Sequence, residues 1–329
     1  MQALARFASL ITSLAALGTG LLLAQPAHAQ GQYPDKPVRF VVPYAPGGLP
    51  DTVARILGKS LGERWGQQVL IDNRPGGNGV VAAQFVNAAT PDGYTLLVTD
   101  NSMIAINPAL YPKLPYDPKA FVPVALVARA PLYLAVNPAL PVNTLQEFLA
   151  LIKSKPSALS YGSSGIGSTH HLAMESLKTT LGLNIVHVPF KGTGQSVPAV
   201  VAGDVAAVFS AGPSVFGFAK NGKIKLIAVN SLKRATLSPN IPTIAETVVP
   251  GFDFAPTIGV LAPARTPTNV VLQVSADVAR TTRLPTVVEN MQTLGIDPVG
   301  ASGEEYAVVL REDAERYAKA VKAADVKME

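Results

Sequence analysis

The fold of this chain is decided by the stretch FVVPYAPGGLPD, which occupies residues 40–51. Its first three residues, Phe40–Val42, are apolar and prone to extended conformation, which predicts a buried strand. Pro43 and Pro46 end that strand because neither can donate a backbone hydrogen bond. The pair Gly47–Gly48 then allows a sharp turn of the backbone, so that the chain reverses direction immediately after the strand.

A helix is predicted directly after this turn and ends at Gly66. Pro50 and Asp51 suit a first helical turn, since proline there loses no hydrogen bond and a carboxylate favours the positive end of the helix dipole. One face of the helix is apolar at helical spacing: Val53, Ile56, Leu57, Leu61 and Trp65. A strand, a glycine turn and a helix N-terminus in this order offer free backbone N–H groups to an anion. The alternative is that Gly47–Gly48 only connects a strand to a helix.

The N-terminus has the pattern of a secretory signal peptide. Arg6 lies at the edge of an apolar run over residues 7–23, and the small-x-small triplet Ala27–Ala29 follows as a cleavage site. The run is short for a membrane span, which disfavours the alternative of an anchor. We therefore expect residues 1–29 to be a signal peptide, and a mature protein that is exported to the periplasm.

The composition excludes several classes of protein. The chain has 329 residues, no cysteine and a formal net charge of +5, and its 27 basic residues are dispersed along the sequence. The absence of cysteine excludes disulfides and thiolate sites. Dispersed charge without interleaved aromatic residues argues against a nucleic-acid partner.

Strands and helices alternate after the first unit, which indicates an α/β fold. Strands are predicted at residues 69–71 and 95–99, with a helix at 80–89 between them. Because ligands of such sheets gather at the carboxyl ends of the strands, Pro43–Gly48 and Asn101–Ser102 are expected to lie at one edge. The pattern Gly77-x-Gly79-x-x-Ala82 fits a loose dinucleotide fingerprint, but it follows its strand only after a long turn, which favours a plain glycine turn.

A second glycine turn occurs in the middle of the chain. The segment GSSGIGS at residues 162–168 follows a short predicted strand and precedes a helix that begins with Thr169. Ser168 is a good N-cap candidate. Hydroxyls and backbone N–H groups together suit a carboxylate.

Several segments together resemble the Bug family, the TctC receptors of tripartite tricarboxylate transporters. The resemblance covers essentially the whole mature chain and is carried by residues 33–39, 42–48, 51–55, 73–77, 91–97 and 162–177. It implies an α/β periplasmic-binding-protein fold of the type II kind, with two parallel or mixed sheets flanked by helices and two hinge strands. The expected lobes are residues 30–127 with 259–329, and residues 128–258. The hinge is expected near residues 126–130 and 257–261.

The resemblance and the two turns together give the expected ligand site. Backbone N–H groups of residues 45–48 and 164–168 would hold carboxylate oxygens from opposite lobes, and a β-branched residue at Gly48 would restrict the first turn. The family usually has Tyr at Phe190 and often Asp at Ser210, so this chain lacks a hydroxyl and an acid there. The expected ligand-binding residues are Tyr44, Ala45, Pro46, Gly47, Gly48, Asp51, Asn101, Ser102, Ser163, Ser164, Gly165, Gly167, Ser168, His171, Phe190, Lys191, Gly192 and Ser210.

These features predict a receptor and not an enzyme, with no catalytic residue, no metal and no cofactor. His170 and His171 are adjacent on a helix and lack the spacing of a zinc site. The expected ligand is a mono- or dicarboxylate without an ammonium group, and the expected partner is a membrane permease of the tripartite tricarboxylate type, served by a monomer. Three alternatives stay open: an exported serine hydrolase using Ser164 or Ser168 with His171, a protein-binding module, and a carboxylate sensor that acts on a signalling partner.

Overall fold

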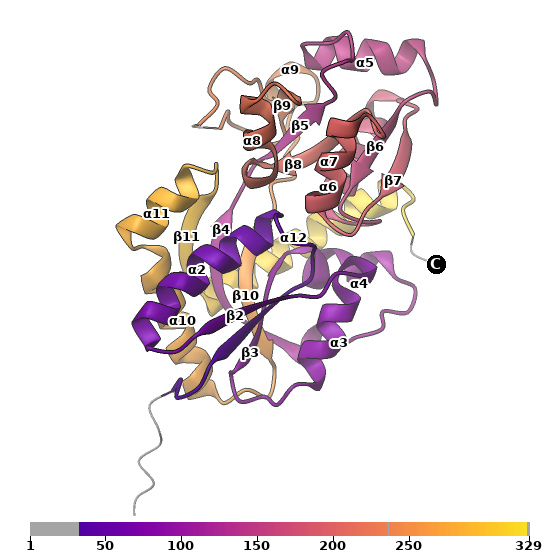
Figure 1. Ribbon diagram of the computed structural model, residues 1–329. Helices are drawn as coiled ribbons and strands as arrows, with labels where there is room; N and C mark the ends of the chain where they lie inside the picture. The colour runs from indigo at the N-terminus through magenta and orange to yellow at the C-terminus, as the bar shows by residue number, and fades with distance from the viewer. Residues whose placement is uncertain (1–32, 236, 328–329) are drawn as a thin grey trace, which may run out of the picture. The chain divides into compact units, whose positions relative to one another are not determined.

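The computed structural model describes residues 33–235 and 237–327 (Figure 1). The predicted signal peptide therefore lies outside the described residues. From Lys36 to the end, the chain packs as one unit. That unit contains two sheets, each with its own helices and its own apolar core.

The first sheet has six strands in the order β11-β4-β10-β3-β1-β2. The central strand β1 is parallel to β2 and β3, whereas β10 is antiparallel to both β3 and β4. The mixture arises because β10 returns to this sheet late in the chain. The strands are β1 (Val38–Val42), β2 (Val69–Asn73), β3 (Thr95–Asp100), β4 (Phe121–Arg129), β10 (Thr257–Pro263) and β11 (Asp297–Ser302).

The second sheet has five strands in the order β7-β6-β8-β5-β9. Here β6 is parallel to β7 and β8, while β5 is antiparallel to β8 and β9. The strands are β5 (Leu132–Val136), β6 (Ser160–Ser163), β7 (Val186–Pro189), β8 (Ala207–Ala211) and β9 (Lys225–Val229).

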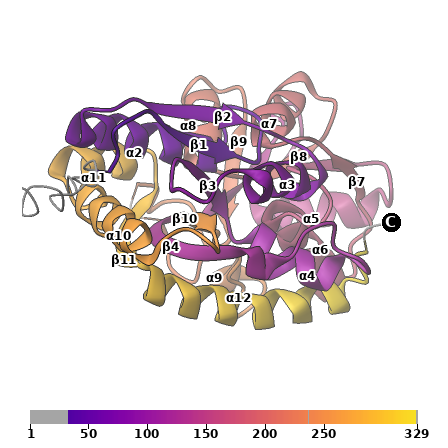
Figure 2. The same ribbon diagram turned by 90° about the horizontal axis from the view of Figure 1, so that it is seen from below.

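Helices flank both sheets, and Figure 2 shows α12 running beneath β4 and β10. With the six-stranded sheet are α2 (Leu49–Trp65), η1 (Gly77–Gly79), α3 (Val80–Ala88), η2 (Ser102–Ile106), α4 (Asn107–Leu110), η3 (Pro118–Ala120), α10 (Thr268–Thr282), α11 (Pro285–Gln292) and α12 (Gly303–Ala323). With the five-stranded sheet are α5 (Leu145–Ser154), α6 (Thr169–Leu181), α7 (Thr193–Ala202), α8 (Gly212–Lys220) and α9 (Ile244–Thr247).

The local sequence explains where the main helices begin and end. Capping boxes start α5 at Thr144 and α12 at Ser302, each paired with a glutamate three residues later. Ser168 caps α6, and Gly66 ends α2 in the left-handed conformation. The predicted α/β architecture with two mixed sheets is confirmed. Helix α8 and strand β11 were not predicted.

The chain passes between the two sheets twice. It leaves the six-stranded sheet after Arg129 and enters the five-stranded sheet at Leu132. It returns between the end of β9 and Thr257, where β10 pairs along β4. We refer to the six-stranded sheet with its helices as the first lobe and to the five-stranded sheet with its helices as the second lobe. The residue boundaries of the lobes and the role of these crossings as hinges stay predictions.

Candidate functional site

The first glycine turn connects β1 to α2, and an internal clamp holds it in place. Gly47 has a φ of 86°, a conformation that favours glycine, and its N–H donates to the carboxylate of Asp51 at 2.9 Å. Arg55 and Asn73 donate to the same carboxylate. Burial alone would raise the pKa of Asp51, but these hydrogen bonds outweigh it and lower the pKa. Asp51 therefore stabilises the turn and has no free oxygen facing a ligand.

Gly48 does not have the role that the sequence suggested. Its φ is −82°, an ordinary extended value that any residue can adopt, so the expectation that a β-branched side chain would restrict the turn is wrong. A Cβ at this position would instead lie 3.1 Å from Oγ1 of Thr193, which belongs to the second lobe. The constraint on Gly48 is therefore the close approach of another loop.

The second glycine turn connects β6 to α6, and its own groups use much of its hydrogen-bonding capacity. The hydroxyl of Ser168 accepts from the N–H of His171 and donates to the carbonyl of Gly165, at 3.2 and 2.7 Å. The N–H of Gly167 donates to Nδ1 of His171 at 3.0 Å. Ser163 bonds to His187 through its hydroxyl. Ser168, Gly167 and His171 thus shape the turn, and none of them lines the cavity described below.

The two lobes touch through these turns. The N–H of Ala45 donates to the carbonyl of Lys191 at 3.2 Å, and the hydroxyl of Ser214 donates to the carbonyl of Gly47 at 3.0 Å. A Cβ on Gly194 would lie only 2.1 Å from the carbonyl oxygen of Pro46. The contact between the lobes is therefore direct, and it depends on a glycine at position 194.

Beside this contact lies a cavity of about 160 Å³ with walls from both lobes. The first lobe contributes the turn after β1 and the turn after β2, and the second lobe contributes the turn after β6 and the end of β7. The lining residues are Pro43, Tyr44, Gly76, Gly77, Asn78, Ser164, Gly165, Ile166, Pro189, Phe190 and Lys191. Strand ends of both sheets thus meet at one cavity, as expected for a ligand site of an α/β fold.

The cavity contains five of the residues that the sequence predicted for the site. They are Tyr44, Ser164, Gly165, Phe190 and Lys191. Ala45, Pro46, Gly47, Gly48 and Gly192 belong to the contact between the loops or its immediate neighbours. The remaining predicted residues do not line the cavity: Asp51, Asn101, Ser102, Ser163, Gly167, Ser168, His171 and Ser210.

Sequence reasoning missed the turn Gly76–Asn78, which it interpreted as a plain connection. This turn follows β2, the strand next to β1, so it lies at the same edge of the sheet as Pro43–Gly48. Asn78 is held in a left-handed conformation by a hydrogen bond from its side chain to Asn107. The signal that could have found it is the order of the strands, because neighbouring parallel strands place their carboxyl-terminal turns side by side.

The cavity is weakly positive and otherwise neutral. Lys191 is the one charged residue among those that line it. Tyr44 presents its ring, because its hydroxyl donates to Asp100 at 3.0 Å. Burial and the neighbouring Asp100 raise the pKa of Tyr44, so the phenol stays neutral. An anion is thus favoured over a cation in this space.

A stack of aromatic rings supports the second turn. The rings of His171 and His187 lie 3.9 Å apart between centroids, and Tyr161 stacks on His187 at 4.9 Å. Burial lowers the pKa of His171 to about 4 and, with the neighbouring His171, that of His187 to about 3. Both rings are therefore neutral at pH 7, and Glu175 lies close to the stack through its bonds to Tyr161 and Lys178.

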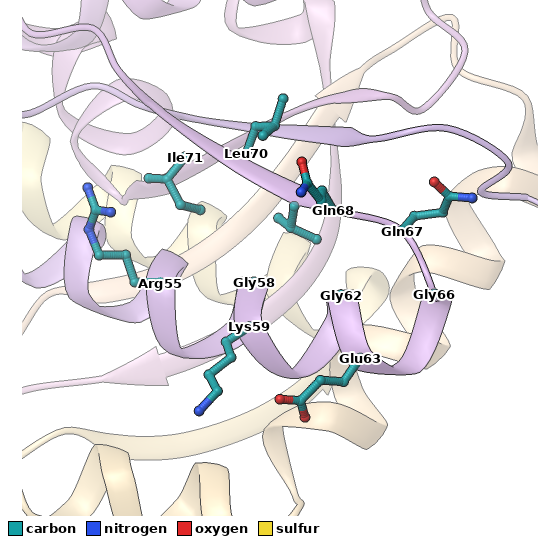
Figure 3. Close-up of a pocket in the computed structure, with 11 residues that line it drawn as sticks. Arg55, Gly58, Lys59, Gly62, Glu63, Gly66, Gln67, Gln68, Leu70 and Ile71 are labelled. Atoms are coloured by element: carbon teal, nitrogen blue, oxygen red, sulfur yellow. The ribbon is translucent and has the colours of Figure 1, made fainter.

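A larger hollow lies elsewhere, between α2 and β2 (Figure 3). Its volume is about 780 Å³, but it contains none of the three turns. Three charged side chains line it, Arg55, Lys59 and Glu63. Arg55 is paired with Asp51, and Lys59 and Glu63 carry opposite charges and extend from α2 away from the strand (Figure 3). Because this hollow lies away from the contact between the lobes, we take the smaller cavity as the candidate site.

The serine hydrolase alternative needs a base and an orienting acid. His171, the base considered from the sequence, accepts from a backbone N–H and contacts no serine hydroxyl at Nδ1. Ser164 instead meets Nδ1 of His170, whose Nε2 has no hydrogen-bond partner among the described residues. No carboxylate of the described residues bonds to His170 to complete a triad with Ser164. Nor do the described residues include three or more metal-ligating side chains grouped for a metal ion.

Fold and cavity together define a two-lobed α/β binding protein. The family model of the "Tripartite tricarboxylate transporter family receptor" matches residues 53–326. The chain belongs to this family, as its resemblance to Bug proteins predicted. "Protein BugT" of Bordetella pertussis is 31% identical over 308 residues, which are 93% of this chain and 94% of BugT.

Two similar solved structures contain bound acids. "R. palustris Rpa4515 with adipate" is 33% identical with a TM-score of 0.87, and covers 90% of this chain and 99% of that one. MatC from Rhodopseudomonas palustris with bound malate is 31% identical with a TM-score of 0.83, and covers 88% and 100%. Searched over its described residues, the chain has no helix long and apolar enough to cross a membrane.

Replacing Gly194 by alanine should separate the two loops. The new Cβ would collide with the carbonyl of Pro46, so the hydrogen bond from Ala45 to Lys191 should break. Amide hydrogen exchange at Ala45 should become faster by about tenfold or more. Gly217→Ala is the control, because its Cβ would meet nothing within 4 Å. Unchanged exchange at Ala45 in Gly194→Ala would contradict the contact.

The histidine stack should make the protein less stable in acid. The folded-state pKa of His187 is lowered to about 3, so the unfolded chain binds its proton first as pH falls below about 6.5. Stability from this group is thus complete above that pH and is lost as pH decreases. Because the ring is partly exposed, we expect His187 to lower the free energy of unfolding by roughly 1–2 kcal/mol between pH 7 and pH 5.

The variant His187→Gln separates the pH-dependent stability contributed by His187 from that of the other titrating groups. Its amide can still reach Ser163 but takes up no proton. Urea unfolding at both pH values should show a smaller decrease in unfolding free energy than for the wild type. Asp100, whose pKa burial raises, acts in the opposite direction in both proteins and so cancels. Equal decreases in the two proteins would show that His187 is not the acid-sensitive group.

Proposed function

We propose that this chain is an exported receptor that holds a small carboxylate between its two lobes and delivers it to a membrane permease. The observation that carries the proposal is the cavity between the lobes, which strand-end segments of both lobes form around a single cation, Lys191. Membership of the receptor family supports the transport role. The acids bound in two similar structures, adipate and malate, support the chemical class.

The acid is held mainly by backbone groups of the second turn. The N–H groups of Ser164 and Ile166 have no acceptor among the described residues, and both residues line the cavity. The dipole of α6, which begins just after this turn, favours a negative charge there. Gly47 and Gly167 are not part of this set, because their N–H groups already have acceptors within the protein.

The rest of the lining determines what else the ligand carries. No acidic side chain lines the cavity, so an ammonium group would find no counter-ion. Phe190, Ile166 and the ring of Tyr44 offer apolar surface to an aliphatic or aromatic body. A mono- or dicarboxylate without an amino group fits this combination.

Closure follows from contacts that the ligand makes with both lobes. A ligand that touches both walls stabilises the closed form, in which the lobes meet, relative to an open form. The shift in this equilibrium equals the difference between the free energies with which the ligand binds the two forms. The crossings near residues 126–130 and 257–261 act as hinges between lobes of residues 30–127 with 259–329 and residues 128–258. The protein works as a monomer in the periplasm after loss of residues 1–29, and its partner is a permease of the tripartite tricarboxylate type.

Thermal unfolding with a panel of acids tests this function. Adipate, malate, benzoate and glutamate should be compared, and a carboxylate without an amino group should raise the unfolding temperature while glutamate does not. In Lys191→Gln, affinity measured by calorimetry should decrease by about tenfold. Lys155→Gln, at the residue that follows α5, is the control and should bind like the wild type.

Three outcomes would overturn the proposal. Tight binding of glutamate, with no response to the other acids, would contradict the absence of an ammonium partner. Turnover of a p-nitrophenyl ester that Ser164→Ala abolishes would favour a hydrolase. A deletion strain that takes up the acid normally would contradict the transport role.

A further inference from the structure

Ser164 and His170 form an isolated buried pair at the edge of the cavity. Oγ of Ser164 lies 2.6 Å from Nδ1 of His170, and the two residues are 4% and 6% exposed. Ser164 lines the cavity, and no other described group bonds to its hydroxyl. On the far side of the ring, Nε2 is buried and has no partner in the part of the chain that the structure describes.

The ring of His170 carries a single hydrogen on nitrogen at neutral pH. Burial lowers the pKa of His170 to about 4, so one nitrogen is protonated and the other has a lone pair. The position of that hydrogen decides which way the hydroxyl of Ser164 points, because a hydroxyl that accepts from the ring is free to donate elsewhere.

The two tautomers leave different groups unpaired. With the hydrogen on Nε2, a buried N–H has no acceptor, and the hydroxyl of Ser164 must donate to the ring. With the hydrogen on Nδ1, the unpaired group is a lone pair, and Ser164 accepts. Buried N–H groups without an acceptor are rarer in proteins than acceptors that are not fully used. The surroundings of Nε2 therefore favour the hydrogen on Nδ1.

We propose that His170 is a positioning residue that donates from Nδ1 to Ser164 and so directs the hydroxyl hydrogen of Ser164 into the cavity. This inference rests on the proposed function, because the directed hydrogen is then a donor to a carboxylate oxygen of the ligand. A donor at this point favours an accepting oxygen, above all an anionic one, over an N–H of the ligand.

The neighbouring histidine supplies an internal reference with the opposite tautomer. Nδ1 of His171 accepts the N–H of Gly167, so its hydrogen must lie on Nε2, which faces Glu175 at 3.7 Å. Adjacent residues of α6 thus hold their ring hydrogens on different nitrogens. One spectrum can compare them under identical conditions.

Nitrogen NMR of the ligand-free protein at pH 7 tests the tautomer directly. In a spectrum that correlates ring nitrogens with ring hydrogens, His170 should show a protonated Nδ1 and His171 a protonated Nε2. Loss of one set of signals in His170→Gln assigns them. A protonated Nε2 on His170 would overturn the inference, whatever the ligand proves to be.

A double-mutant cycle tests whether His170 acts through Ser164. With adipate as the first probe and malate as the second, Ser164→Ala and His170→Leu should each weaken binding about threefold to tenfold. In the Ser164→Ala background, His170→Leu should have no further effect. His170→Asn keeps an N–H near the position of Nδ1 and should restore most of the affinity.

The outcomes separate this inference from the proposed function. An equal loss from His170→Leu in both backgrounds, or no rescue by asparagine, would mean that His170 only packs, and would overturn the positioning role. If the wild type binds neither acid nor any other of the panel, the carboxylate function fails. The spectrum alone then decides the tautomer.

Discussion

The structure depends on the direct contact between the turn after β1 and the loop after β7. Ala45 donates a hydrogen bond to Lys191 in that loop, and Ser214 of the neighbouring helix α8 donates a second one to Gly47. The contact is possible because Gly194 lets two backbones approach more closely than any side chain would permit. It closes one side of the cavity, and the other turns only need to follow their strands to complete the walls.

The site attracts an anion with little formal charge. Lys191 is exposed, and the remaining attraction comes from backbone N–H groups and the dipole of α6. Buried groups near the site are kept neutral: His170 and His171 by burial, and Tyr44 by burial beside Asp100. Such an arrangement binds a carboxylate without a large desolvation cost for buried charges on the protein.

The sequence predicted the fold well where local patterns are strong. The strand, turn and helix of residues 40–65 are all present, as is the second turn with Ser168 as the cap of α6. The family resemblance added the two sheets. Missed were α8, whose Gly212–Lys220 sequence is apolar with two glycines, and β11, whose Asp297–Ser302 sequence contains proline and glycine.

Predictions of the site were less complete, because which hydrogen bonds a group makes depends on the tertiary structure. The sequence places Asp51 and Ser168 near a ligand turn. Only the structure shows that the side chain of each makes its hydrogen bonds to other groups of its own turn. The turn Gly76–Asn78 was missed because the sequence does not show that β2 lies next to β1, which brings this turn to the cavity. His171 was kept as a candidate site residue but His170 was not, since nothing in the sequence indicates that His170 reaches the hydroxyl of Ser164.

The most direct test of this account is a crystal structure of the mature protein with the acid that stabilises it most. The account predicts the acid in the cavity between the lobes, with carboxylate oxygens within hydrogen-bond distance of the N–H groups of Ser164 and Ile166 and near Lys191. An acid bound in the groove between α2 and β2, with no acid between the lobes, would contradict it.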